Sequence, residues 1–168
     1  FRPTIRVFDP WLTESHLLRE GVVPASLEEV LANSRYVFVV AAVTENNSGM
    51  LNSAKLDLMQ HGAGLLLLNR AAIADFEALA EYTAQGKIRL ATDVFPEEPL
   101  ALDHPIRKSP NVLLSAHRAG ALNSALLEMG DLVLEDLKLM EQGLPPQNCK
   151  RAEPETVASL RSKPVEKS

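Results

Sequence analysis

The stretch that decides the fold is residues 88–120, IRLATDVFPEEPLALDHPIRKSPNVLLSAHRAG. Two mostly apolar runs within it, residues 88–94 and 112–116, are typical of buried strands. The first run carries Asp93 and continues to Glu98, and the second leads into His117. Because open α/β sheets bind their ligands at the carboxyl ends of the strands, we expect these acids and this imidazole to share one edge of a sheet.

Composition places the chain among ordinary globular proteins of one domain. Of its 168 residues, 46% are hydrophobic and 23% are charged, and the net charge is −5. This charge offers no attraction to nucleic acid, and no apolar run reaches the ~20 residues of a membrane helix. The N-terminal residues do not resemble a signal peptide, and the single Cys149 fits a reducing compartment, so we expect a cytoplasmic protein with neither kind of partner.

Strand patterns alternate with helix patterns along the chain. The expected strands are residues 4–8, 36–43, 65–68, 88–94 and 112–116. The expected helices are residues 15–20, a second opened by Ser26 with Glu29 as a capping box, residues 52–59, 74–85 and 121–142. This alternation predicts an α/β fold with a doubly wound parallel sheet, and the valine-rich run 36–43 predicts a strand covered on both faces.

The last expected helix has an apolar stripe that we interpret as core. Its members, spaced by three and four residues, are Leu122, Leu126, Met129, Val133, Leu137 and Met140. The motif GLPP at residues 143–146 ends this helix. We therefore expect a domain over residues 1–146 and a tail over residues 147–168 that is flexible or docks on another domain.

Several motifs together resemble one enzyme family. They are MQHGA at residues 59–63 with the strand and RA at 70–71, GKIRLATDVFPEEPL at 86–100, and NVLLSAHRAG at 111–120. Over roughly residues 5–146 the chain is similar to the NAD-binding domain of the D-isomer-specific 2-hydroxyacid dehydrogenases, a family that includes phosphoglycerate dehydrogenases. It departs from the family pattern at residues 40–44 (VAAVT), Leu67, Ala71 and Ala116.

The resemblance implies an oxidoreductase that moves a hydride between NAD(H) and C2 of a small 2-hydroxy or 2-oxo acid. It assigns catalysis to Arg70 as substrate anchor, His117 as acid and base, and Glu98 as its partner. These residue types suit the chemistry, because a guanidinium grips a carboxylate and an imidazole beside a carboxylate transfers protons. Each residue taken alone also has a simpler interpretation. Arg70 could be an ion-pair partner at the end of a strand, Glu98 a solvated loop carboxylate, and His117 a histidine at the edge of the core.

Cofactor contacts follow from the same likeness. Asp9 is placed to bind the adenosine ribose and to favour NAD over NADP, although an Asp-Pro pair also starts turns. Asp93 would face the nicotinamide carboxamide. The expected cofactor-binding residues are Asp9, Ala42, Val43, Leu68, Asn69, Arg70, Asp93, His117, Ala119 and Gly120. The remaining histidines have no partners at metal-ligand spacing, so we expect no metal.

One expected motif is missing, because no G-x-G-x-x-G occurs in the sequence. The resemblance therefore implies a partial domain that lacks its N-terminal part with the glycine-rich turn, and poor activity of this chain alone. It also implies a homodimer in the full-length protein. A second hypothesis is a non-enzymatic NAD-sensing or co-regulatory module with the same fold, for which the altered residues 40–42 leave room.

Overall fold

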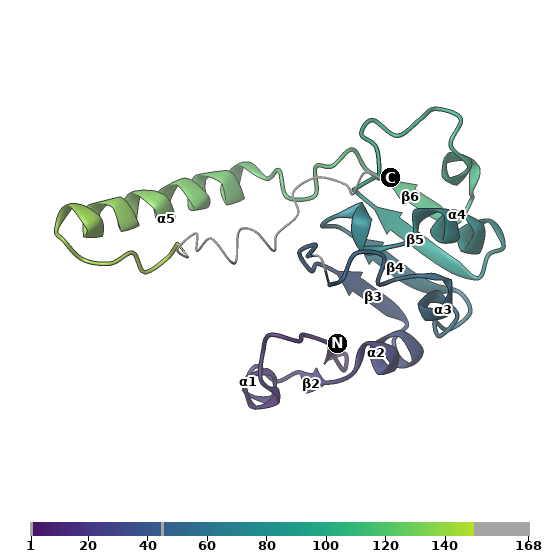
Figure 1. Ribbon diagram of the computed structural model, residues 1–168, viewed down its shortest axis with the longest axis horizontal. Coiled ribbons are helices and arrows are strands. Elements are labelled where there is room, and N and C mark those ends of the chain that lie inside the picture. The colour runs from purple at the N-terminus through teal and green to yellow at the C-terminus, as the bar shows by residue number, and fades with distance from the viewer. Residues whose placement is uncertain (1, 45, 150–168) are drawn as a thin grey trace.

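Six parallel strands form two sheets in the computed structural model, which describes residues 2–44 and 46–149 (Figure 1). Their order is β1-β2 in one sheet and β3-β4-β5-β6 in the other. The bounds are β1 Arg6–Val7, β2 Val23–Pro24, β3 Tyr36–Val39, β4 Ala63–Leu67, β5 Ile88–Thr92 and β6 Val112–Leu114. The predicted parallel α/β class is confirmed. Strand β2 was not predicted, because two residues that include a proline carry no periodic signal.

The five predicted helices are present. They are α1 Glu14–Arg19, α2 Leu27–Asn33, α3 Ser53–Leu56, α4 Phe76–Ala84 and α5 Asn123–Glu141, with 3₁₀ turns η1 Ala71–Ile73 and η2 Pro105–Lys108. Two of them, α2 and α3, begin directly after the predicted caps Ser26 and Asn52. Helices α4 and α5 each begin two residues later than predicted. Ser26 and Glu29 form the predicted capping box, and the Asn52 side chain accepts from Lys55 N–H. These caps satisfy backbone donors that a helix start leaves free, which is why local sequence located them.

The hydrophobic core lies on one face of the four-stranded sheet. Side chains that alternate along β3, β4 and β5 meet residues of α2, α3 and α4 there. The largest of these fully buried side chains are Leu31, Leu56, Leu65, Leu67, Leu79 and Ile88. The core thus holds β3 to β6 in one rigid layer, and so fixes where their carboxyl ends point.

The opposite face of this sheet is exposed around β3. Tyr36 and Phe38 alternate with the buried Val37 and Val39, and Phe38 is 63% exposed. The Tyr36 ring lies against Gly64 so closely that a Cβ there would sit 2.7 Å from the ring. The prediction of a strand covered on both faces is therefore wrong for these residues. The strand itself is confirmed over Tyr36–Val39, whereas residues 40–43 of the predicted strand lie in the loop after it. The described elements cover only the inner side of β3.

Helix α5 extends away from both sheets (Figure 1). Its predicted core stripe is wrong as a description of this chain, since Met129 is 61% exposed and Leu126 and Val133 are exposed as well. Periodicity predicts which side of a helix is apolar but not which element covers it. Although α5 has 19 residues, no helix in residues 2–44 and 46–149 is long and apolar enough to cross a membrane.

Asp136 is the one buried residue of α5, and it anchors the chain that follows the helix. Its carboxylate accepts from the backbone N–H groups of Asn148 (3.0 Å), Gln147 (2.8 Å) and Cys149 (2.6 Å). These donors, Asn148 foremost, outweigh the effect of burial and lower the pKa of Asp136 from 3.8 to about 2. The first three residues of the predicted tail, 147–149, are therefore hydrogen-bonded to α5. The rest of the tail, residues 150–168, lies outside the described part of the chain.

Replacing Asp136 with alanine should release residues 147–149, because three N–H groups lose their shared acceptor. We expect faster hydrogen exchange at these three amides, measured by NMR. In the unmodified protein the anchor should be intact above pH ~4 and weaken as pH falls through about 2, since the pKa of Asp136 is depressed in the folded state. Asp131→Ala on the exposed side of α5 is the matched control, and equal exchange rates in both variants would contradict the anchor.

Candidate active site at the carboxyl edge of the sheet

His117 and Glu98 form a direct pair beyond the carboxyl ends of β6 and β5. The distance from His117 Nδ1 to Glu98 Oε2 is 2.8 Å, and that to Oε1 is 3.0 Å. Both side chains are partly exposed, so the pair is open to a ligand. The two residues are 19 positions apart in sequence, and the parallel pairing of β5 with β6 brings them to one edge as predicted.

Glu98 is held in its ionised form. Burial alone would raise its pKa, but hydrogen bonds from His117 and from Phe95 N–H, with the charges of His117 and Arg70, lower it overall. An ionised carboxylate only accepts hydrogen bonds, so Nδ1 of His117 carries the proton shared with Glu98. The other ring nitrogen, Nε2, is left to act on a ligand. The pair therefore has a fixed tautomer and one working nitrogen.

Asp93 holds the turn that presents His117. Its carboxylate oxygens accept from Arg118 N–H (2.9 Å) and Ala119 N–H (2.6 Å), and its side chain is 1% exposed. Burial raises the pKa of Asp93, but these two donors, the Ser115 hydroxyl and the charge of His117 lower it overall. His117 itself has a φ of 51°, in the left-handed region that non-glycine residues seldom adopt. The buried carboxylate thus stabilises an unusual backbone conformation at the imidazole.

Arg70 follows β4 at the same edge of the sheet. Its guanidinium is exposed, and Nη1 donates to Asn69 O at 2.9 Å, which leaves most of its donors free. Strand β4 pairs with β5, the strand that leads to Glu98, and the positive charge of Arg70 contributes to the lowered pKa of Glu98. The structure therefore gathers the three predicted catalytic residues at one edge, with Glu98 and His117 in contact and Arg70 beside them.

The loops after β3 and β4 contain most of the other predicted cofactor residues. Asn69 Nδ2 donates to Val40 O at 2.9 Å, which ties the two loops together, and Leu68 N–H pairs with Val39 O. Ala42 is exposed, whereas the side chain of Val43 is 3% exposed and belongs to the core. Only the backbone of Val43 is therefore available to a ligand, and Gly120 is exposed at the end of the histidine turn.

Asp9 lies in the loop that follows β1, two residues after the strand ends. Its Oδ1 accepts from Trp11 N–H at 2.8 Å and from Leu12 N–H at 3.2 Å, so the turn-starting role weighed above is present. These bonds use only one of the two carboxylate oxygens. Oδ2 remains able to accept from a hydroxyl group, and the ribose role stays a prediction.

Two supporting residues escaped sequence analysis. Thr92 is buried and its hydroxyl bonds Val94 O at 2.8 Å, which turns the chain toward Glu98. Arg107 donates to Leu100 O and Ala101 O and so braces the loop after Glu98. Thr92 could have been noticed in the sequence as a polar residue within an apolar strand. No feature of the sequence pointed to Arg107. In the described ranges, no three His, Cys, Asp or Glu side chains gather as a metal site would require.

Comparison with known proteins agrees with this geometry. The sequence profile of the D-isomer specific 2-hydroxyacid dehydrogenase NAD binding domain matches residues 1–119. The chain belongs to this family. The family binds a nicotinamide dinucleotide, and the carboxyl edge that carries Glu98 and His117 is where such folds bind it.

Individual relatives place the chain within longer family members. The D-3-phosphoglycerate dehydrogenase of Bacillus subtilis is 32% identical over 146 residues, which cover 86% of this chain and 28% of that protein. A phosphoglycerate oxidoreductase structure from Rhizobium etli has a TM-score of 0.80 and 55% identity, covering 89% of this chain and 45% of that one. A relative from Xanthobacter autotrophicus, solved with NADPH and MES, has a TM-score of 0.71 and 27% identity over 82% of this chain and 45% of that one. The chain thus spans less than half the length of these relatives.

Asp93→Ala should destabilise the protein, because two backbone N–H groups beside His117 lose their buried acceptor. Hydrogen bonds to a charged group contribute about 1.5–3 kcal/mol each, so we expect a decrease of at least about 1 kcal/mol in the free energy of unfolding, measured with urea. Asp103→Ala removes an exposed loop carboxylate and serves as the control. Equal stabilities of the two variants would show that Asp93 does not hold the turn.

Proposed function

We propose that this chain is the cofactor-binding part of an enzyme that transfers a hydride between NAD(H) and C2 of a small 2-hydroxy or 2-oxo acid. The observation that carries the proposal is the 2.8 Å contact between His117 Nδ1 and Glu98 Oε2, with Arg70 beside it. An imidazole with a fixed tautomer, an ionised partner and a free guanidinium form the set that reduction of a 2-oxo acid requires.

Each of the three residues has a defined role in this proposal. Arg70 binds the substrate carboxylate through its free N–H donors, which orients the neighbouring carbonyl group. Protonated His117 donates its Nε2 proton to the carbonyl oxygen as negative charge develops there, and takes it back in the reverse direction. Glu98 stabilises the positively charged imidazole and prevents the ring from turning.

The residues at this edge fit a nicotinamide dinucleotide. When bound, the cofactor would supply or accept the hydride at C4 of its nicotinamide ring. The backbone around Ala42, Asn69 and Gly120 is accessible to the nicotinamide half. Asp93 has both oxygens engaged, yet each carboxylate oxygen accepts more than one hydrogen bond, so it can still hold the carboxamide. Oδ2 of Asp9 is free for the ribose.

The unpaired strand edges support the proposed domain organisation. Within the described ranges, β1 pairs only with β2, and β3 only with β4, so one edge of each is open. We propose that residues 1–146 are most of an NAD-binding domain and that a strand with the glycine-rich phosphate turn lies between β1 and β3 in the complete protein. Residues 147–168 would pass to a substrate domain. The exposed apolar side of α5 and the bare face of β3 provide surface for that domain and for a homodimer.

The protein's surroundings follow from its charge and chemistry. With a net charge of −5 it favours small organic acids held by a local arginine over nucleic acid or an anionic membrane. A single cysteine and a nicotinamide cofactor are compatible with the cytoplasm, where we place this enzyme.

The test of this function is NADH oxidation by the full-length protein with glyoxylate or pyruvate as the 2-oxo acid. His117→Ala should lower kcat by about 10²–10⁴-fold, the usual contribution of a general acid, while NADH binding followed by fluorescence stays unchanged. His16→Ala, a histidine of α1 distant from this edge in sequence and structure, is the matched control. NADH binding without turnover by the unmodified protein would contradict the enzyme and favour the sensor hypothesis.

Asp9→Asn tests the predicted preference for NAD over NADP. Asparagine keeps an oxygen that can accept from Trp11 and Leu12 N–H, so the turn should persist while the negative charge is lost. We expect the unmodified protein to bind NADH more tightly than NADPH, and the variant to narrow that ratio by about tenfold, or ~1.4 kcal/mol, because the 2′-phosphate is no longer repelled. An unchanged ratio of the two dissociation constants would remove Asp9 from the cofactor site.

A further inference from the structure

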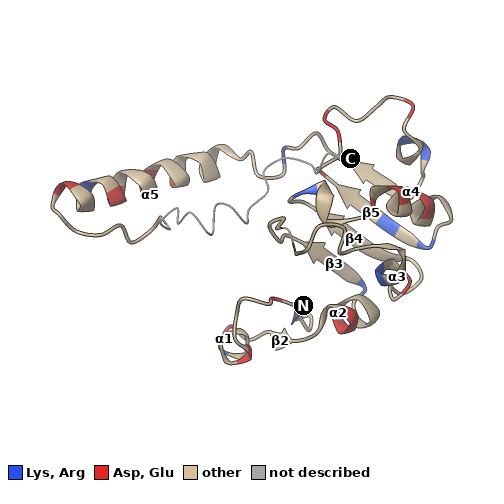
Figure 2. Cartoon of the chain, in the orientation of Figure 1, with Lys and Arg blue, Asp and Glu red and all other residues tan. Residues whose placement is uncertain are grey.

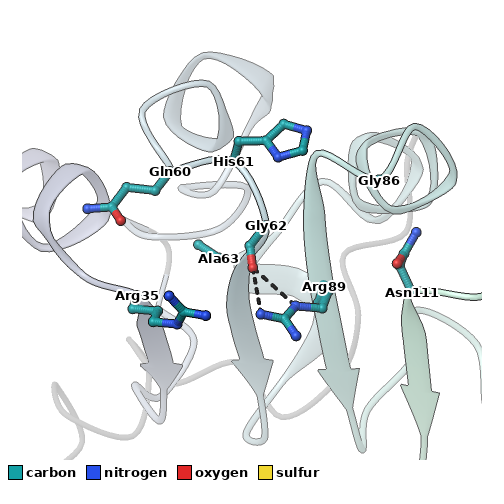
Figure 3. A pocket seen from close by; sticks show the side chains of 8 residues that line it. All are labelled: Arg35, Gln60, His61, Gly62, Ala63, Gly86, Arg89 and Asn111. Carbon is teal, nitrogen blue, oxygen red and sulfur yellow. Dashed lines mark hydrogen bonds between the residues drawn. The ribbon is translucent and has the colours of Figure 1, made fainter.

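A second polar site lies at the amino ends of β3 to β6, at the edge of the sheet opposite His117. It is a hollow of about 360 Å³ (Figure 3). Its lining residues are Arg35, Gln60, His61, Gly62, Ala63, Gly86, Arg89 and Asn111. None of them takes part in the chemistry proposed above, so the hollow needs an explanation of its own.

Two guanidinium groups face this hollow. Arg35 directly precedes β3 and Arg89 lies in β5, and the two side chains extend toward the start of β4 from either side (Figure 3). Strands in a sheet are ~4.8 Å apart, so β3 and β5 stand ~10 Å apart with β4 between them. Gly62, which directly precedes β4, and Ala63, its first residue, lie between these two strands and also line the hollow.

Arg89 is held in place with donors to spare. Its Nε and Nη2 donate to Gly62 O at 3.1 and 2.9 Å, which orients the guanidinium fork, and Nη1 makes no hydrogen bond within residues 2–44 and 46–149. Arg35 makes no salt bridge with any carboxylate in the described ranges of the chain. The amides of Gln60 and Asn111 are already used, since they donate to Ala32 O and Thr83 O near the ends of α2 and α4.

The charge of the hollow is entirely positive. Its lining includes two arginines and a histidine but no aspartate or glutamate. Figure 2 shows the same arrangement, with basic positions ahead of β3 and within β5 and the acidic ones on the neighbouring helices. Gln60 and Asn111 bond carbonyls near helix ends, and two donors of Arg89 bond the carbonyl of the Gly62 turn. These contacts do not account for Arg35 or for the remaining donors of Arg89.

We propose that this hollow binds a compact, doubly charged oxyanion of the phosphate type, either free or as the phosphate group of a larger molecule. Guanidinium forks match the oxygen geometry of phosphate, and two forks on opposite sides of one anion neutralise both charges. His61 at the rim adds a further donor. Because the hollow is at the edge opposite Glu98 and His117, its occupation is independent of the proposed hydride transfer.

Titration of the full-length protein with inorganic phosphate tests this site. Binding would be measured by calorimetry and by NMR at constant ionic strength, with shifts expected at Gly62, Ala63 and Arg89. Arg35→Gln should weaken binding about tenfold or more, which corresponds to ~1.4 kcal/mol, and Arg35→Lys should restore only part of it because an ammonium lacks the fork. Both variants should fold normally, since Arg35 is exposed and makes no salt bridge in residues 2–44 and 46–149.

Arg19→Gln is the control, because it removes the same charge from the end of α1 and leaves the hollow intact. Phosphate should bind this variant as it binds the unmodified protein. The proposal is overturned if phosphate does not bind, if Arg35→Gln binds it unchanged, or if Arg19→Gln weakens binding equally. A phosphate ester that binds more tightly than free phosphate, with the same dependence on Arg35, would identify the larger molecule as the ligand and also support the site. The test is independent of the proposed hydride transfer, because phosphate binding at the hollow is measured without turnover.

Discussion

The candidate active site depends on the hydrogen bonds that Arg118 and Ala119 N–H donate to the buried carboxylate of Asp93. They hold a turn in which His117 adopts a φ of 51°, and only that turn brings Nδ1 to 2.8 Å from Glu98. A buried carboxylate can hold such a turn because the backbone N–H groups that stabilise its charge are thereby fixed in position. Asp93 therefore acts on the chemistry through the backbone, whatever contact it makes with the cofactor.

The two edges of the four-stranded sheet differ for a physical reason. Parallel strands all end at one edge, and the loops that follow them are free to carry ligand-binding side chains such as Arg70, Glu98 and His117. The amino edge faces helix ends whose carbonyls need donors, so amides and arginines gather there. Gln60 and Asn111 donate hydrogen bonds to such carbonyls, whereas no such role is seen for the Arg35 side chain among the described residues. The surplus of positive charge is what sets this edge apart as a second binding surface.

Apolar surface is distributed unevenly over the molecule. Helices α2, α3 and α4 pack on the inner face of the four-stranded sheet. Tyr36 and Phe38 on its other face are exposed, and so is most of α5. Helix α5 extends away from the sheet (Figure 1). An amphipathic helix of 19 residues and the bare face of a sheet are both patterns of buried elements. Their exposure, together with the open edges of β1 and β3, agrees with a chain that spans less than half the length of its relatives.

Local patterns in the sequence determined the parallel α/β class and the helix caps at Ser26 and Asn52, and the family resemblance supplied Arg70, Glu98 and His117 as candidates for one site. Hydrophobic periodicity and helix caps extend over a few residues, and the family motifs have recognisable spacings, so all of them can be identified from the sequence alone. The tertiary structure alone decided three other matters: the two-residue strand β2, the exposure of the α5 stripe, and the meeting of Arg35 with Arg89. Each of these three features depends on which segments, distant in sequence, lie side by side in space. Hydrophobic periodicity and amino-acid composition do not contain that information.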